Sequence, residues 1–160
     1  MWNRLVWFLF LILSGVNAWA DPNDAVVQHV WVSESIPGQN SATLGLNITT
    51  VQAAKLVAVS ADVADKVEIH NMAQHWGKMS ARVVNSLPLP AHHTTAFGKH
   101  QLFLILVGLK KELNIGDSVR VSLVIEYATH RKQTAEVEAP VKKMVLSYKH
   151  LRSEPVHDHQ

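Results

Sequence analysis

The sequence predicts a single all-β domain, built as a sandwich or a barrel. Apolar and β-branched residues come in short runs of strand length, and turn residues separate these runs. No long segment has a convincing helical period. The chain has 160 residues, the length of one domain, and it contains no cysteine. A small domain without disulfides depends on a packed core, which two facing sheets can enclose.

The first four expected strands are apolar runs between polar or turn residues. Residues 26–32 precede a turn at residues 35–40 that contains Pro37 and Gly38. Residues 42–50 alternate well enough to form a half-buried strand, and residues 55–60 and 66–71 are two shorter runs.

Four further strands are expected in the second half of the chain. Residues 78–84 end before two prolines, and residues 101–107 form an apolar strand closed by Gly108. Residues 118–127 show the clearest alternation, and residues 133–139 return beside them through a hairpin at 128–131. One face of 118–127 is expected to carry Val119, Val121, Leu123, Ile125 and Tyr127.

The chain begins with the features of an export signal. Arg4 precedes a short apolar run, and Ala18-Trp19-Ala20 has the small-x-small pattern of a cleavage site. We expect a signal peptide at 1–20 cleaved near Ala20, a domain at 21–141 and a polar, His-containing tail at 142–160. The alternative is an uncleaved N-terminal anchor. The mature protein is then expected in the periplasm, outside the membrane.

Composition and motifs exclude several function classes. The formal net charge of +2 is too small to indicate a nucleic-acid partner. The absence of cysteine excludes thiolate metal sites and a Cys nucleophile. No hydrolase, zinc-protease or phosphate-loop motif is present, so no enzyme activity is expected. Asp62, Asp65 and Glu68 look like ordinary surface charges beside a strand.

Several segments, taken in order and spacing, resemble the periplasmic copper(I) chaperone family PCu(A)C. They are Trp31 with Pro37-Gly38, the segment from Ser60 to His70, Pro90-Ala91, and Gly108-Leu109-Lys110 with Leu113 and Gly116-Asp117. The resemblance implies a cupredoxin-like Greek-key β-sandwich. It also implies that the protein carries copper(I) and delivers it to the copper subunit of cytochrome oxidase or to its assembly factors.

The family signature is a His, then a Met, then a His-x-Met pair. The first His matches His70, but the remaining three positions hold Ala81, Phe103 and Ile105. Copper(I) prefers thioether and imidazole donors, and these three side chains have neither. The usual four-donor site is therefore not expected. A shift in register would bring His100 nearer the third position, but it would break the Gly108 match and invert the strand faces.

His70, Met72, His75 and Met79 lie on two strands joined at Trp76-Gly77 and offer the donors for a weak two- or three-donor copper(I) site with an altered arrangement. The alternative is a polar surface His with methionines that fill the core.

Other histidines offer further candidates. His92, His93 and His100 follow Pro90 and either build an imidazole site for copper(II) or zinc or form a solvated loop. In the tail, His157 and His159 flank Asp158 and form a candidate copper(II) or zinc site, or else a disordered polar tail.

The sequence therefore predicts a monomeric, exported copper-chaperone-like protein. A first alternative is a metal-free interaction module, in which Phe103 and Ile105 extend an apolar surface where copper would lie. A second alternative is a copper(II) or zinc buffer that acts through the His-containing tail.

Overall fold

The computed structural model describes residues 24–75 and 78–143, and for residues 74, 75, 78 and 79 it describes the backbone alone. The described part is all-β, as expected, and contains ten strands. They are β1 (Val26–Ser33), β2 (Ser41–Thr49), β3 (Ala54–Ala61), β4 (Ala64–His75), β5 (Lys78–Val84), β6 (Leu87–Leu89), β7 (Thr94–Phe97), β8 (Leu102–Leu109), β9 (Ser118–Tyr127) and β10 (Lys132–Lys142). Among these residues there is no helix long and apolar enough to cross a membrane. The expected signal peptide and most of the tail lie outside them.

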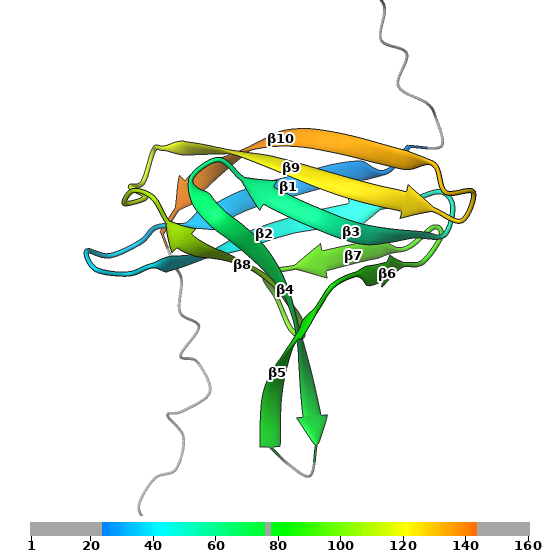
Figure 1. Cartoon of the computed structure of the whole chain (residues 1–160), viewed down its shortest axis with the longest axis horizontal. Coiled ribbons are helices and arrows are strands. Elements are labelled where there is room, and N and C mark those ends of the chain that lie inside the picture. Colours follow the sequence, from blue (N-terminus) through cyan, green and yellow to red (C-terminus); the bar gives the residue numbers. More distant parts are fainter. Residues whose placement is uncertain (1–23, 76–77, 144–160) are drawn as a thin grey trace, which may run out of the picture.

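The strands form a two-layered sandwich of the cupredoxin-like type (Figure 1). One layer has the order β5-β4-β8-β2-β1, and the other has the order β10-β9-β3-β6. The layers join where β1 runs parallel to β10, with Val32 opposite Val141. The remaining strand, β7, pairs with β2. This architecture confirms the fold class expected from the sequence.

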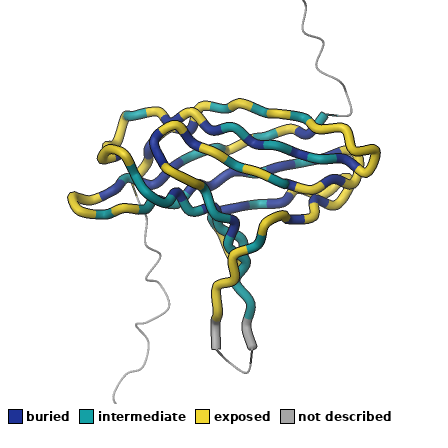
Figure 2. The backbone as a smooth tube through the Cα atoms, in the orientation of Figure 1, coloured by how far each residue is buried: buried dark blue, intermediate teal, exposed yellow. Residues whose placement is uncertain are grey.

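The core lies between the two layers and comes from alternate residues of their strands. All five residues predicted for the apolar face of β9 are buried, and the face of β2 that meets them carries Ala42, Leu44, Leu46 and Ile48. Figure 2 shows the same alternation as dark blue and lighter segments along the facing strands. The inner face of β8 contributes Leu104 and Leu106, both fully buried. Their neighbours on β8 therefore point to the outer face.

Two short strands, β6 and β7, were not predicted. The Leu87–Leu89 strand has three residues, one of them a proline, and Thr94–Phe97 has four. Both form because a longer strand offers a free edge: β3 pairs with β6, and β2 pairs with β8 along its first half and with β7 along its second. A local sequence pattern does not contain this long-range information.

The β4–β5 hairpin projects from the body of the sandwich (Figure 1). It begins within the sheet, where Ala64 to Asn71 pair with β8, and it continues beyond that strand as a two-stranded ribbon with β5. The ribbon is also tied at its base, because the Met72 N–H donates to the Gln101 carbonyl at 2.7 Å. The hairpin therefore starts on a rigid sheet and ends in a projecting arm.

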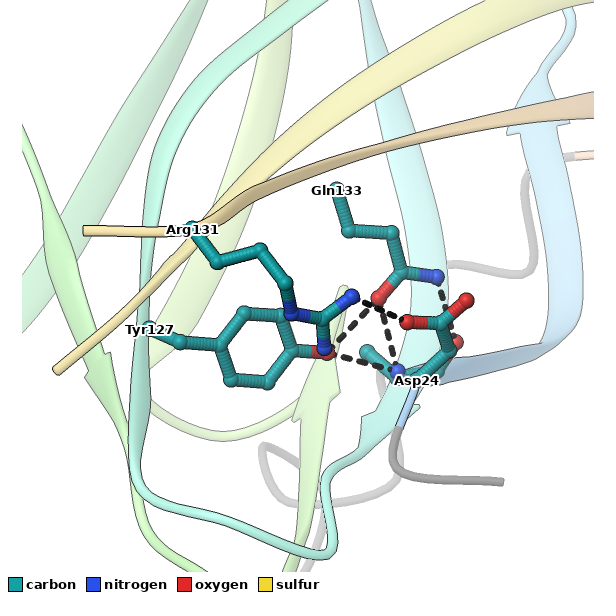
Figure 3. Close-up of polar contacts among 5 residues, drawn as sticks. Asp24, Tyr127, Arg131 and Gln133 are labelled. Atoms are coloured by element: carbon teal, nitrogen blue, oxygen red, sulfur yellow. Dashed lines mark hydrogen bonds and ion pairs between the residues drawn. The ribbon is translucent and has the colours of Figure 1, made fainter. Parts of the chain in front are cut away.

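A polar clamp fixes the first described residues to the β9–β10 hairpin (Figure 3). The Tyr127 hydroxyl accepts a hydrogen bond from the Ala25 N–H at 2.8 Å and donates one to Gln133 Oε1 at 2.7 Å. Gln133 also bonds both backbone groups of Ala25. Arg131 covers the Tyr127 ring at 4.2 Å and pairs with Asp24 at 2.7 Å. Asp24 and Ala25 are thus held in place against the β9–β10 hairpin.

Candidate functional site

The four ligand positions of the PCu(A)C signature meet on the outer face of β4, β5 and β8. In the strand register His70 lies opposite Phe103 on β8 and opposite Val83 on β5. Directly opposite residues in an antiparallel pair have Cβ atoms about 4.5–5.5 Å apart and share a face. His70 is half-buried, whereas its neighbour Ile69 is 5% exposed and belongs to the core. The imidazole is therefore on the outer side of the sheet.

The cross-strand pairs on either side of His70 place the remaining ligand positions of the signature. Met72 lies opposite Ala81 on β5, and Glu68 lies opposite Ile105 on β8. Ala81, Phe103 and Ile105 thus lie around His70, where the ungapped match to the family places them. His100 precedes β8 and has no partner on β4, so the shifted register is wrong.

The side chains at these positions do not fit the usual four-donor copper(I) site. Only His70 has a donor atom, because Ala81, Phe103 and Ile105 have purely hydrocarbon side chains. Phe103 and Ile105 are half-buried. Any metal held on this face must therefore use His70 together with side chains outside the usual set.

A chain of charge along β4 orients the imidazole. Lys66 Nζ lies 2.6 Å from Glu68 Oε1, and Glu68 Oε2 lies 3.0 Å from His70 Nε2. An ionised carboxylate only accepts hydrogen bonds, so Nε2 carries the proton and donates it to Glu68. Hydrogen bonds from Lys66 first and His70 second hold the pKa of Glu68 below its usual range. In the neutral imidazole, the Nδ1 lone pair is then left for another partner.

Glu68, expected as an ordinary surface charge beside a strand, has two charged or polar partners on β4. Its side chain is 23% exposed and is paired on both sides. The signal was present in the sequence: Lys66, Glu68 and His70 alternate, so a strand places all three on one face. Asp65 and Asp62 are exposed, as expected.

The other expected donors are placed only in part. Met72 is half-buried on the same outer face of β4 as His70, two residues further along the strand. The backbone of Met79 lies opposite Gln74 and that of His75 opposite Lys78, while their side chains are outside the described part. His157 and His159 also lie outside the described residues.

The histidines after Pro90 do not join His70. The backbone N–H of His92 donates to the Thr50 carbonyl at 2.7 Å, while His93 and His100 line a common groove elsewhere. Among residues 24–73 and 80–143, no three His, Asp or Glu side chains are grouped closely enough to hold a metal ion. An imidazole-rich zinc or copper(II) site is thus not formed by the described side chains.

Comparison with known proteins supports the resemblance. The model of the family described as "Putative lipoprotein LpqE-like" matches residues 25–141, which is most of the chain. A comparison with curated proteins finds no significant match.

Solved structures with the same fold include three copper-related domains. The apo PCuAC domain from PmoF1 is 21% identical, with a TM-score of 0.62, covering 78% of this chain and 98% of that one. The copper-bound PCuAC domain from PmoF2 is 16% identical, with a TM-score of 0.59, covering 75% and 93%. The copper(I) form of DR1885 from Deinococcus radiodurans is 26% identical, with a TM-score of 0.56, covering 80% and 83%. The chain belongs to the LpqE-like family, and its fold is that of the solved PCuAC domains.

Proposed function

We propose that this protein is an exported copper carrier that holds copper(I) on the outer face of β4. The proposed donors are His70 and Met72, with Met79 as a third donor from β5. The observation that carries the proposal is the common face of His70 and Met72, at the place where the ligand positions of the family meet. An imidazole and a thioether are the soft donor types that copper(I) prefers.

The surroundings of His70 suit this chemistry. Glu68 accepts the hydrogen bond from Nε2–H, so Nδ1 would be the atom that holds the metal, and this hydrogen bond raises the basicity of the ring. Phe103 and Ile105 provide an apolar wall beside the imidazole, which favours a low-charge, soft ion over hydrated divalent ions. Glu68 acts here as a positioning residue, since its carboxylate contacts the imidazole.

The projecting hairpin gives a route for delivery. Met72 lies where β4 passes beyond β8, so a metal held there is at the base of an arm that leaves the sandwich. We propose, from the PCu(A)C relationship, that the acceptor is the copper subunit of cytochrome oxidase or one of its assembly factors. The polar tail would add copper(II) or zinc binding through His157 and His159.

An anaerobic titration with copper(I) against a competing chelator tests the site. We expect one copper(I) per chain in the wild-type protein, no tight binding in His70→Ala, and binding weakened by at least about tenfold in Met72→Leu, which keeps the shape but removes the sulfur. His93→Ala, on an exposed residue away from this face, is the matched control. Equal affinity in wild type and His70→Ala would overturn the proposal. A chain ending at Lys149 separates any contribution of the tail.

A second candidate is a metal-free interaction module, which one observation favours. Val83 is 53% exposed on one side of His70, and half-buried Phe103 lies on the other side of it. The variant Phe103→His/Ile105→Met restores the missing His-x-Met pair and decides between the candidates. If it binds copper(I) while the wild-type chain does not, the scaffold is intact but the natural protein has left copper chemistry.

A further inference from the structure

A groove with a volume of about 380 Å³ opens beside β6, β7 and the turn that leads into β8. Its apolar wall includes Leu87, Pro88 and Leu102, of which Leu87 is 7% exposed. Three basic side chains also line it: His93, Lys99 and His100. These are the only ionisable residues of the lining, and none is acidic. The groove thus combines an apolar wall with three basic side chains and no acidic one.

The turn that carries two of these basic residues has a defined backbone. The Gly98 N–H donates to the Leu102 carbonyl at 2.8 Å, and Lys99 forms a bridge to Leu102. His100 lies in the left-handed region with φ of 59°, a conformation in which His is enriched among non-glycine residues. A fixed turn presents its cations with less loss of entropy on binding than a flexible one.

At the edge of the groove along β6, a bound molecule would meet side chains more than backbone hydrogen-bond donors. Pro88 and Pro90 both line the groove, and neither has an N–H to donate to an extended peptide. Recognition by strand addition along β6 is therefore disfavoured. The groove is better suited to a molecule with an apolar body and an anionic group than to a β-strand of a partner.

We propose that this groove binds a small organic anion. The apolar body packs on Leu87, Leu102 and the prolines, and the anionic group lies against His93, Lys99 and His100. No carboxylate lines the groove to repel an anion. The groove adjoins the base of the copper face, since the carbonyl of Gln101 in its lining accepts the Met72 N–H, but none of its residues is a proposed copper ligand.

The fluorescent anion 8-anilinonaphthalene-1-sulfonate is a suitable probe, with neutral N-phenyl-1-naphthylamine as its uncharged counterpart. We expect the full chain to bind the anion more tightly than the neutral compound, because three basic side chains and no acidic one line the groove. Lys99→Gln and His100→Asn should each weaken binding about two- to fivefold, the range for an ion pair at a solvent-exposed site. His70→Ala should leave it unchanged, which separates this result from the copper titration.

Two control variants match His100→Asn in backbone conformation. His92 (φ 56°) lies outside the groove lining, and His130 (φ 61°) lines another hollow, of about 430 Å³, beside Leu89 and Tyr127. His92→Asn and His130→Asn should both bind the anion as the wild-type chain does. Binding that falls in His130→Asn but not in His100→Asn, or equal binding of the anion and the neutral compound, would overturn the proposal. Circular dichroism of each variant verifies that it is folded.

Discussion

Replacing Tyr127 by phenylalanine should release the clamp that holds the start of the domain. The substitution keeps the ring, which is 2% exposed in the core, and removes only the hydroxyl. Two hydrogen bonds are lost, one from the Ala25 N–H and one to Gln133 Oε1. The Ala25 N–H keeps its bond to Gln133 Oε1 at 2.7 Å, so no buried donor is left unpaired.

The expected loss of stability depends on whether a buried group is left without any hydrogen-bond partner. A typical intramolecular hydrogen bond contributes about 0.5–1.5 kcal/mol net, whereas an orphaned buried group costs more. With two bonds lost and no group orphaned, Tyr127→Phe should lower the free energy of unfolding by about 1–2 kcal/mol. For a domain of this size that corresponds to a fall in Tm of roughly 3–10 °C.

Urea unfolding, followed by tryptophan fluorescence, measures the change, and the m-value should stay constant. A double-mutant cycle with Gln133→Ala provides the control, because the two side chains are hydrogen-bonded. We expect a coupling energy of about 0.5–1.5 kcal/mol between them. Tyr127→Phe with unchanged stability, or independent effects of the two substitutions, would refute the clamp as a stabilising element.

Three further predictions concern the core, a close contact and the charge chain. Leu104→Ala, at a fully buried position, should cost about 2–5 kcal/mol in urea unfolding, whereas Ser80→Ala on the exposed hairpin should cost almost nothing. Gly45→Ala should cost about 1–3 kcal/mol by the same measurement, since a methyl group there overlaps the Trp31 indole. In the metal-free protein the lowered pKa of Glu68 stabilises the fold above the pKa of the unfolded chain, and this contribution disappears as the pH falls through the folded pKa. Glu68→Gln should therefore be less stable than the wild type at neutral pH, and the difference should vanish in acid; a constant difference would contradict the assignment.

The strands that sequence alone predicted well are those whose burial shows in local alternation. Strand β9 was placed with its correct ends and its correct buried face, because every second residue packs into the core. Strand β7 was missed because its four residues are ordered by pairing with the far half of β2, which no local pattern contains. In the candidate site, too, some features follow from the sequence and others need the three-dimensional structure. The family spacing places His70 opposite Phe103, and strand alternation places Glu68 on the same face as His70, but the hydrogen bond between these two side chains requires side-chain geometry.

The separation of the two faces of β8 explains how this fold can persist without the usual ligands. Leu104 and Leu106 point inward and are fully buried, while Phe103 and Ile105 alternate with them on the outer face. Substitution on the outer face therefore leaves the core contacts of the strand unchanged. The core packing of β8 depends on the inner residues, and the proposed metal binding depends on the outer face. For the same reason a loss of copper binding in an outer-face variant such as His70→Ala can be attributed to the site, because the core that maintains the fold is not altered.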